Sequence, residues 1–173
     1  DRQQMETVNV QGTENVIKAC LKNQVSRLIY MSSVVAIGAS FDDKSILNEQ
    51  SEYKLQNLNL GYFETKRKAE ELVHQSVKEN NLDAVILNPS TIYGAGDAEK
   101  GSRSVQIKVA KGKFPFYTSG GVNVVAVEDV VEGQFLALDL GPVGQGGHHR
   151  GGFTVKRSRL VGVLAVTHAL HLV

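Results

Sequence analysis

The stretch AVILNPSTIYG, at residues 84–94, decides the fold class of this chain. It opens with four consecutive apolar residues and then changes abruptly to asparagine and proline at positions 88 and 89. A short apolar run that ends in turn residues is typical of a strand buried on both faces, as in a parallel sheet. We interpret residues 84–87 as such a strand and residues 88–94 as the turn that follows it.

Helix and strand patterns alternate on both sides of this strand. Further apolar runs predict strands at 26–30 and 123–127. Apolar residues at helical spacing predict helices at 8–21, 62–79, 103–111 and 129–138. Asp129 is expected to cap the last helix, and the polar residues 38–61 predict a long surface connection. The alternation indicates an α/β protein.

Composition and charge narrow the classes of function. The 173 residues are 42% hydrophobic and 21% charged, which describes one ordinary globular domain. A net charge of +1, without a basic cluster, indicates no nucleic-acid partner, and no apolar run reaches the roughly 18–20 residues of a membrane helix. Cys20 is the single cysteine, which excludes a disulfide scaffold. We therefore expect a small-molecule partner and a cytoplasmic location, with no nucleic-acid or membrane partner.

Tyr62 and Lys66 are the first candidates for chemistry. They are four residues apart on a predicted helix, so their Cβ atoms lie about 5–6 Å apart on one face. A lysine ammonium beside a tyrosine favours the phenolate, which makes Tyr62 a candidate general acid/base. Taken alone, the pair equally describes a surface tyrosine followed by a solvated lysine.

Ser33 is the third candidate, because it follows the predicted strand at 26–30. A serine in this place can simply satisfy backbone groups after the strand. However, ligands of parallel sheets bind outside the carboxyl ends of the strands, and residues 88–94 follow the next predicted strand. The helix with Tyr62 and the two strand ends should therefore converge on one edge of the sheet.

Five motifs occur in a specific order: NVQGT (9–13), YMSS (30–33), YFETK (62–66), NPSTIYG (88–94) and VVAVEDV (124–130). Together they resemble the extended short-chain dehydrogenase/reductases, also called NAD-dependent epimerase/dehydratases, including dihydroflavonol reductase-like and 3β-hydroxysteroid dehydrogenase-like members. The resemblance covers about residues 8–138. It implies a partial Rossmann-type, doubly wound parallel sheet with flanking helices, in which residues 1–140 form the carboxyl-terminal part of an NAD(P)-binding domain.

The resemblance also implies roles for the candidates. Tyr62 would exchange a proton with the substrate oxygen, and Ser33 would hydrogen-bond the same oxygen. Lys66 would hold the nicotinamide ribose and favour ionised Tyr62, and Asn9 would have a supporting role. The cofactor-binding residues expected in this way are Tyr62, Lys66, Pro89, Ser90, Thr91 and Ile92. The cofactor is expected to be NAD or NADP.

The chain departs from the family pattern at its start. No Gly-x-x-Gly-x-x-Gly turn occurs, and the residue that separates NAD from NADP is also missing. We therefore expect a fragment of an NAD(P)-dependent oxidoreductase that acts on a CH–OH or ketone group. A nucleotide-sugar epimerase or dehydratase of the same family, or a catalytically inert truncated product, are the alternatives. The two long helices, at 8–21 and 62–79, could pair two subunits in a homodimer.

Residues 141–173 differ in character from the rest of the chain. They form a glycine- and histidine-rich tail without periodicity, for which we expect disorder, an altered reading frame or an alternative terminus. Four of the five histidines lie there, at His148, His149, His168 and His171. No carboxylate or cysteine accompanies them at ligand spacing, so we predict no metal site.

Overall fold

A computed structural model describes residues 1–41, 45–96, 104–113, 122–139 and 167–168 of the chain. The helices are α1 (Arg2–Met5), α2 (Gly12–Lys22), α3 (Val34–Ile37), α4 (Gly61–Asn80), α5 (Ser104–Ala110) and α6 (Val127–Asp139), with a π-helical turn at Glu6–Gln11 and a 3-10 turn at Gln56–Leu58. The strands are β1 (Leu28–Met31), β2 (Ile46–Leu47), β3 (Ala84–Leu87), β4 (Thr91–Tyr93), β5 (Val124–Ala126) and β6 (Thr167–His168).

Two pairs of parallel strands form the centre of the fold. β1 pairs with β3, with Leu28 opposite Ala84 and Met31 opposite Leu87. β4 pairs with β5 in the same parallel sense, whereas the short strands β2 and β6 are antiparallel. Parallel strands need long crossover connections, and the long helix α4 lies in the connection from β1 to β3. The predicted α/β class with a parallel sheet is confirmed.

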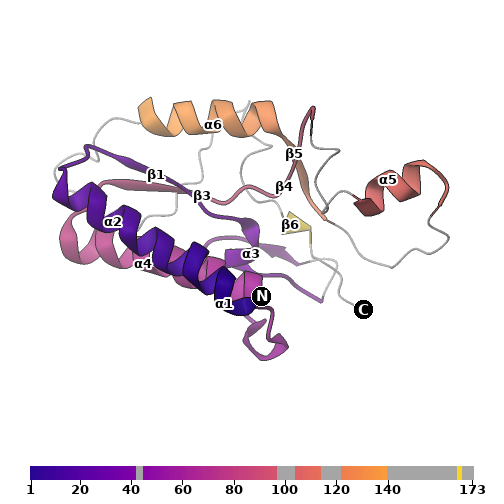
Figure 1. The fold of residues 1–173 in the computed structure, drawn as a ribbon, viewed down its shortest axis with the longest axis horizontal. Coiled ribbons are helices and arrows are strands. Elements are labelled where there is room, and N and C mark those ends of the chain that lie inside the picture. The colour runs from indigo at the N-terminus through magenta and orange to yellow at the C-terminus, as the bar shows by residue number, and fades with distance from the viewer. Residues whose placement is uncertain (42–44, 97–103, 114–121, 140–166, 169–173) are drawn as a thin grey trace.

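Helices cover both faces of the β1–β3 pair (Figure 1). The side chains of α2, α4, the connection that follows α4 and one strand face form a cluster of Ile17, Cys20, Val73, Leu82 and Ile86, with Leu28 and Tyr30 packed against it. The opposite strand face packs against α6 in a second cluster of Val85, Leu87 and Ala137, with Ile29 and Met31. Because successive strand residues point to opposite faces, one apolar run serves both layers. Cys20 is therefore a small buried hydrophobe, as its place on the helical stripe predicts.

Two ion pairs hold the start of α4 against the helical turns at the amino end of the chain. Arg2 forms an ion pair with Glu64, and Lys68 Nζ lies 3.0 Å from Glu6 Oε1. At the other end, Asn81 adopts the left-handed conformation (φ 53°) that commonly follows a helix. Ala69 and Val73 are completely buried along the inner side of α4. The predicted helix at 62–79 is thus confirmed with one more residue at each end.

The connection from 38 to 61 is partly buried, so the prediction that it runs over the surface is wrong. Ala39, Tyr53 and Leu55 form a hydrophobic cluster against Leu60 and Phe63, and Leu55 is only 1% exposed. The apolar residues in this segment follow neither a helical nor a strand period, so no periodic pattern reveals them. Their burial arises from contact with the start of α4.

Two smaller predictions also need correction. Residues 91–93 form strand β4 instead of continuing the turn, because their backbone pairs with residues 124–126. Asp129 does not cap α6, because the helix begins two residues earlier at Val127 and Asp129 lies in its first turn. A carboxylate in the first turn still stabilises the positive amino end of the helix dipole.

The predicted glycine- and histidine-rich tail, residues 141–173, lies outside the described residues apart from Thr167 and His168, which form β6. The disorder, altered frame or alternative terminus predicted for it therefore stays a prediction. In the ranges described above, no helix is both long and apolar enough to cross a membrane.

Candidate functional site

The first turns of α4 carry Tyr62 and Lys66 to the carboxyl end of β1. Lys66 Nζ donates a hydrogen bond to the carbonyl oxygen of Met31, the last residue of β1, at 3.1 Å. The same ammonium lies 5.6 Å from the centre of the Tyr30 ring, within the range of a cation–π contact. Tyr62, one turn earlier, is 46% exposed. The pair therefore combines a half-buried cation with an accessible phenol at the edge where parallel sheets bind ligands.

Tyr30 shows how closely the α4 side chains gather around β1. Burial raises the pKa of the Tyr30 phenol, the hydrogen bond with Thr13 opposes this, and Glu70 and Tyr62 add to the increase. The Tyr30 hydroxyl and Thr13 Oγ1 are 3.3 Å apart. Tyr62 and Glu70, two turns apart on α4, thus both raise the pKa of Tyr30 in β1.

Asn9 contacts the same turn of α4 from the amino-terminal helix. Its side-chain amide donates to Thr65 Oγ1 at 3.0 Å, and Thr65 Oγ1 donates to the Tyr62 carbonyl at 3.1 Å. Asn9 lies in the π-helical turn Glu6–Gln11, and such turns occur often at functional sites. This contact holds the backbone between Tyr62 and Lys66, which agrees with the supporting role expected for Asn9.

Ser33 lies two residues after the last residue of β1, near the strand end as the sequence predicts, and caps α3. Its Oγ accepts a hydrogen bond from the backbone N–H of Val35 at 3.4 Å, so the hydroxyl caps this short helix. The carbonyl of Ser33 accepts from Asn88 Nδ2 at 3.1 Å, and the N–H of Val34 donates to the Pro89 carbonyl at 3.1 Å. The segments that follow β1 and β3 are therefore bonded to each other at Ser33.

The four residues predicted to pass beside a nicotinamide ring begin at this junction. Pro89 bonds the Ser33 segment as described, and Thr91 and Ile92 belong to β4. Ser90 is buried, and its Oγ has no hydrogen-bond partner among the described residues. A buried hydroxyl without a partner costs about 1–3 kcal/mol, so this atom suits a polar group of a ligand. The residues present are therefore compatible with a nicotinamide cofactor.

Glu70 is a member of the site that the sequence analysis missed. Its Oε2 accepts hydrogen bonds from Ser32 Oγ and, at 2.7 Å, from Asn88 Nδ2, and its Oε1 lies 3.7 Å from His74 Nε2. The available signal was the four-residue spacing of Tyr62, Lys66, Glu70 and His74 along one face of α4. Ser32 is buried and its hydroxyl is bonded to Glu70, whereas the Ser33 hydroxyl caps the start of α3.

Burial and neighbouring groups shift the pKa values of the Lys66 and Glu70 side chains. Burial lowers the pKa of the Lys66 ammonium, and the nearby Glu70 charge opposes this. For Glu70, burial by itself would raise the pKa, but the nearby His74 side chain and the hydrogen bonds from Ser32 and Asn88 outweigh it and hold the pKa below its usual value. Glu70 is therefore an ionised carboxylate that supports a cation one turn away.

The lowered pKa of Glu70 predicts an acid-dependent loss of stability. A carboxyl whose pKa is lower in the folded state stabilises the fold above its unfolded pKa of about 4.3, and this contribution disappears as the pH falls through the folded pKa. We expect Glu70→Gln to remove this part of the pH dependence when the free energy of unfolding is measured in urea between about pH 3 and 6. Glu71→Gln, at an exposed neighbour, should keep the wild-type slope. Equal slopes for Glu70→Gln and the wild type would contradict the prediction.

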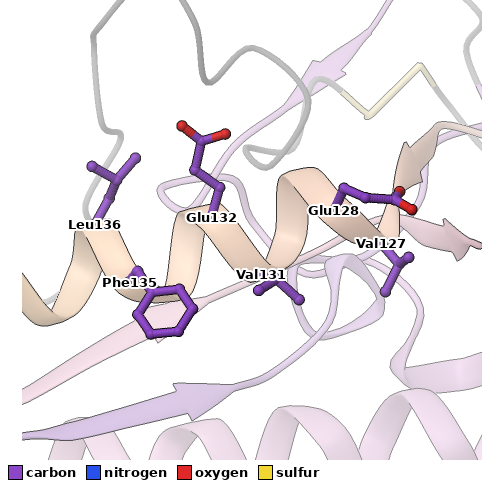
Figure 2. A pocket seen from close by; sticks show the side chains of 6 residues that line it. All are labelled: Val127, Glu128, Val131, Glu132, Phe135 and Leu136. Atoms are coloured by element: carbon purple, nitrogen blue, oxygen red, sulfur yellow. The ribbon is translucent and has the colours of Figure 1, made fainter.

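A separate apolar depression lies on α6 (Figure 2). Its volume is about 520 Å³, and it is lined by Val127, Glu128, Val131, Glu132, Phe135 and Leu136. Because α6 covers the sheet face opposite α2 and α4, this depression is not part of the Tyr62–Lys66 site (Figure 1).

Comparisons of the sequence with known proteins identify a family and relatives that match this chain. Residues 1–139 match the family described as the 3-beta hydroxysteroid dehydrogenase/isomerase family. A 3beta-hydroxysteroid-dehydrogenase/decarboxylase (isoform 2) of Arabidopsis thaliana is 43% identical over 94 residues, which are 53% of this chain and 16% of that protein.

Two solved structures share the fold. The crystal structure of gox2253 is 36% identical with a TM-score of 0.73, covering 80% of this chain and 42% of that one. The UDP-glucose 4-epimerase of Thermus thermophilus, solved as a complex with NAD, is 25% identical with a TM-score of 0.62, covering 76% and 45%. The chain spans less than half of the length of each of these three proteins. The resemblance to extended short-chain dehydrogenase/reductases is confirmed, and the chain belongs to the 3-beta hydroxysteroid dehydrogenase/isomerase family.

Proposed function

We propose that this chain carries the catalytic part of an NAD(P)-dependent oxidoreductase that acts on a CH–OH or ketone group of a small molecule. The observation that supports this most is the position of Lys66, whose ammonium bonds the end of β1 one helical turn from the accessible Tyr62. In this proposal residues 1–140 are the carboxyl-terminal part of the nucleotide-binding domain, and residues 141–173 are an atypical tail.

The three catalytic roles follow from the chemistry of the side chains. Tyr62 donates a proton to the substrate oxygen during reduction and accepts it during oxidation. The Ser33 hydroxyl donates a hydrogen bond to the same oxygen, which it can do while its own oxygen accepts the capping bond from Val35. Lys66 stabilises the negative charge of ionised Tyr62 electrostatically. A phenol at the rim of the site suits this role, because it must reach a substrate that enters from solvent.

A nicotinamide cofactor supplies or accepts the hydride when it is bound. Lys66 would hold its ribose hydroxyls, and the buried Ser90 hydroxyl could bond one of its polar groups. The strip Pro89–Ile92 would lie against the ring and expose one face of it to the substrate.

A nucleotide-sugar epimerase or dehydratase is the second candidate within the same family. The fold shared with the NAD-bound UDP-glucose 4-epimerase supports it. We prefer the reductase or dehydrogenase, because both the matching family and the Arabidopsis relative are described as hydroxysteroid dehydrogenases. A catalytically inert truncated product is the third candidate, and the short span of the chain relative to these proteins supports it.

We further propose that the protein works in the cytoplasm as a homodimer. Its subunits would meet through the amino-terminal helical segment (residues 8–21) and α4. Val8, Val16 and Leu21 are 64%, 49% and 36% exposed, so the amino-terminal helix presents apolar surface to solvent. Covering this surface with the same helix of a second subunit would stabilise the pair. Analytical ultracentrifugation tests this, and a monomer at all accessible concentrations would contradict it.

The proposed activity predicts a clear result for a chimera. The part of gox2253 that precedes the region aligned with this chain, fused ahead of this chain, should produce a protein that binds NADH or NADPH saturably. The chimera should oxidise the bound cofactor while it reduces a ketone to a secondary alcohol. The 173-residue chain alone should fold, as checked by circular dichroism, but should not bind either cofactor, since it has no Gly-x-x-Gly-x-x-Gly turn. Nicotinamide fluorescence measures both properties. A folded chimera that binds the cofactor but reduces no ketone and oxidises no alcohol would contradict the oxidoreductase proposal.

A further inference from the structure

One carboxylate joins the ends of the two central strands. Glu70 Oε2 accepts from the side chain of Ser32, which follows β1, and from the side chain of Asn88, which follows β3. Ser32 and Asn88 are both buried, at 5% and 7% exposure. Buried polar groups that bond a charged acceptor form strong contacts, so this carboxylate restrains both strand ends relative to α4.

Asn88 extends this restraint to Ser33. Its amide nitrogen donates to Glu70 at 2.7 Å and to the Ser33 carbonyl at 3.1 Å, using both of its hydrogens. Val34, the first residue of α3, donates its N–H to the Pro89 carbonyl at 3.1 Å. The Ser33 carbonyl is therefore held by the Asn88 side chain, next to the Val34–Pro89 backbone bond, and Glu70 fixes the orientation of that side chain.

The surroundings of Glu70 also include the other charged groups of the site. Lys66 and His74 lie one turn to either side of it on α4, and Tyr30 faces it from β1. Glu70 acts on the charge of Lys66, whose ammonium is half-buried and bonded to the Met31 carbonyl at 3.1 Å. A carboxylate on the same helix face keeps that ammonium charged in a partly desolvated place.

We propose that Glu70 is a positioning residue of this active site, which holds the Ser33 segment in place through Ser32 and Asn88 and supports the charge of Lys66. The inference rests on the proposed function, because Ser33 and Lys66 are catalytic only if that function holds. Glu70 itself acts through these residues and touches no substrate. The contacts to Glu70 can nevertheless be tested without any turnover.

Hydrogen exchange on the 173-residue chain provides the first test. In Glu70→Gln the amide of Val34 should exchange at least about tenfold faster than in the wild type, because a buried bond to a charged acceptor is lost. The amide of Leu28, which bonds the Asp83 carbonyl at the far end of the same strand pair, should change much less. Glu71→Gln is the matched control and should leave both amides unchanged. If Glu70 only stabilised the fold as a whole, Glu70→Gln would speed exchange equally at Val34 and Leu28.

Lysine side-chain NMR provides the second test, with the Lys66 signal assigned by its loss in Lys66→Arg. Lys66 should lose its proton at a lower pH in Glu70→Gln than in the wild type, and at the wild-type pH in Glu71→Gln. If Glu70→Gln does not fold, Ser32→Ala removes only one donor to Glu70 and should still speed exchange at Val34 more than at Leu28.

The results distinguish this inference from the proposed function. Faster exchange confined to Val34, together with the shifted Lys66 titration, would support the positioning role even if the chimera shows no oxidoreductase activity. Unchanged or uniformly faster exchange would overturn the positioning role, and an active chimera would still support the proposed function. In an active chimera, Glu70→Gln should lower kcat more than it raises KM.

Discussion

Tyr62→Phe should lower kcat of the chimera by about 10²–10⁴-fold while leaving cofactor binding nearly unchanged. The substitution removes a single hydroxyl from a residue that is 46% exposed, so the fold should be unaffected. The proton that Tyr62 supplies must then come from water, which is a weaker and poorly oriented acid at neutral pH. Steady-state oxidation of NADH or NADPH with a ketone substrate measures the effect.

Tyr53→Phe is the matched control for this experiment. Tyr53 is buried in the cluster with Leu55, with Arg67 over its ring, and its hydroxyl has no hydrogen-bond partner among the described residues. Removing that hydroxyl should therefore leave kcat unchanged. If Tyr62→Phe kept wild-type kcat, Tyr62 could not be the proton donor, and the assignment of the catalytic residues would be wrong.

Leu55→Ala should lower the free energy of unfolding by about 2–5 kcal/mol, the range for truncating a fully buried leucine. Leu55 is 1% exposed and packs with Ala39, Tyr53, Leu60 and Phe63, so the truncation leaves a cavity beneath the start of α4. The free energy is measured by urea unfolding followed by circular dichroism.

Leu58 supplies the control in the same connection. It is 42% exposed, and Leu58→Ala should change the free energy of unfolding by less than about 0.5 kcal/mol. Losses below about 0.5 kcal/mol for both variants would mean that the connection between α3 and α4 lies on the surface, as its polar sequence first suggested.

The strand at 84–87 and the helix at 61–80 could be predicted because their signals are local. Four apolar residues followed by asparagine and proline describe a buried strand with its end, and both bounds of β3 match. Apolar residues at three- and four-residue spacing describe the buried face of α4. The candidates Ser33, Tyr62 and Lys66 could be located for the same reason, since each lies at the end or beginning of such an element.

Strand β4 and the burial of Leu55 could not be predicted, because neither has a local cause. Residues 91–93 become a strand only when the distant residues 124–126 accept and donate their backbone hydrogen bonds. Leu55 is buried only because Phe63 and Leu60, at the start of another element, come to lie against it. The polar residues around both segments give no local sequence signal for these contacts.

The sequence by itself determined the α/β class, the family and the positions of the catalytic candidates, because each depends on periodicity or on the order of short motifs. The tertiary structure alone decided which side chains work together at the site. Glu70 meets Ser32 and Asn88 only after two strands separated by more than fifty residues lie side by side, with α4 packed across their ends. A hydrogen bond acts over about 3 Å, so no spacing along the chain can reveal partners that only the fold brings within that distance.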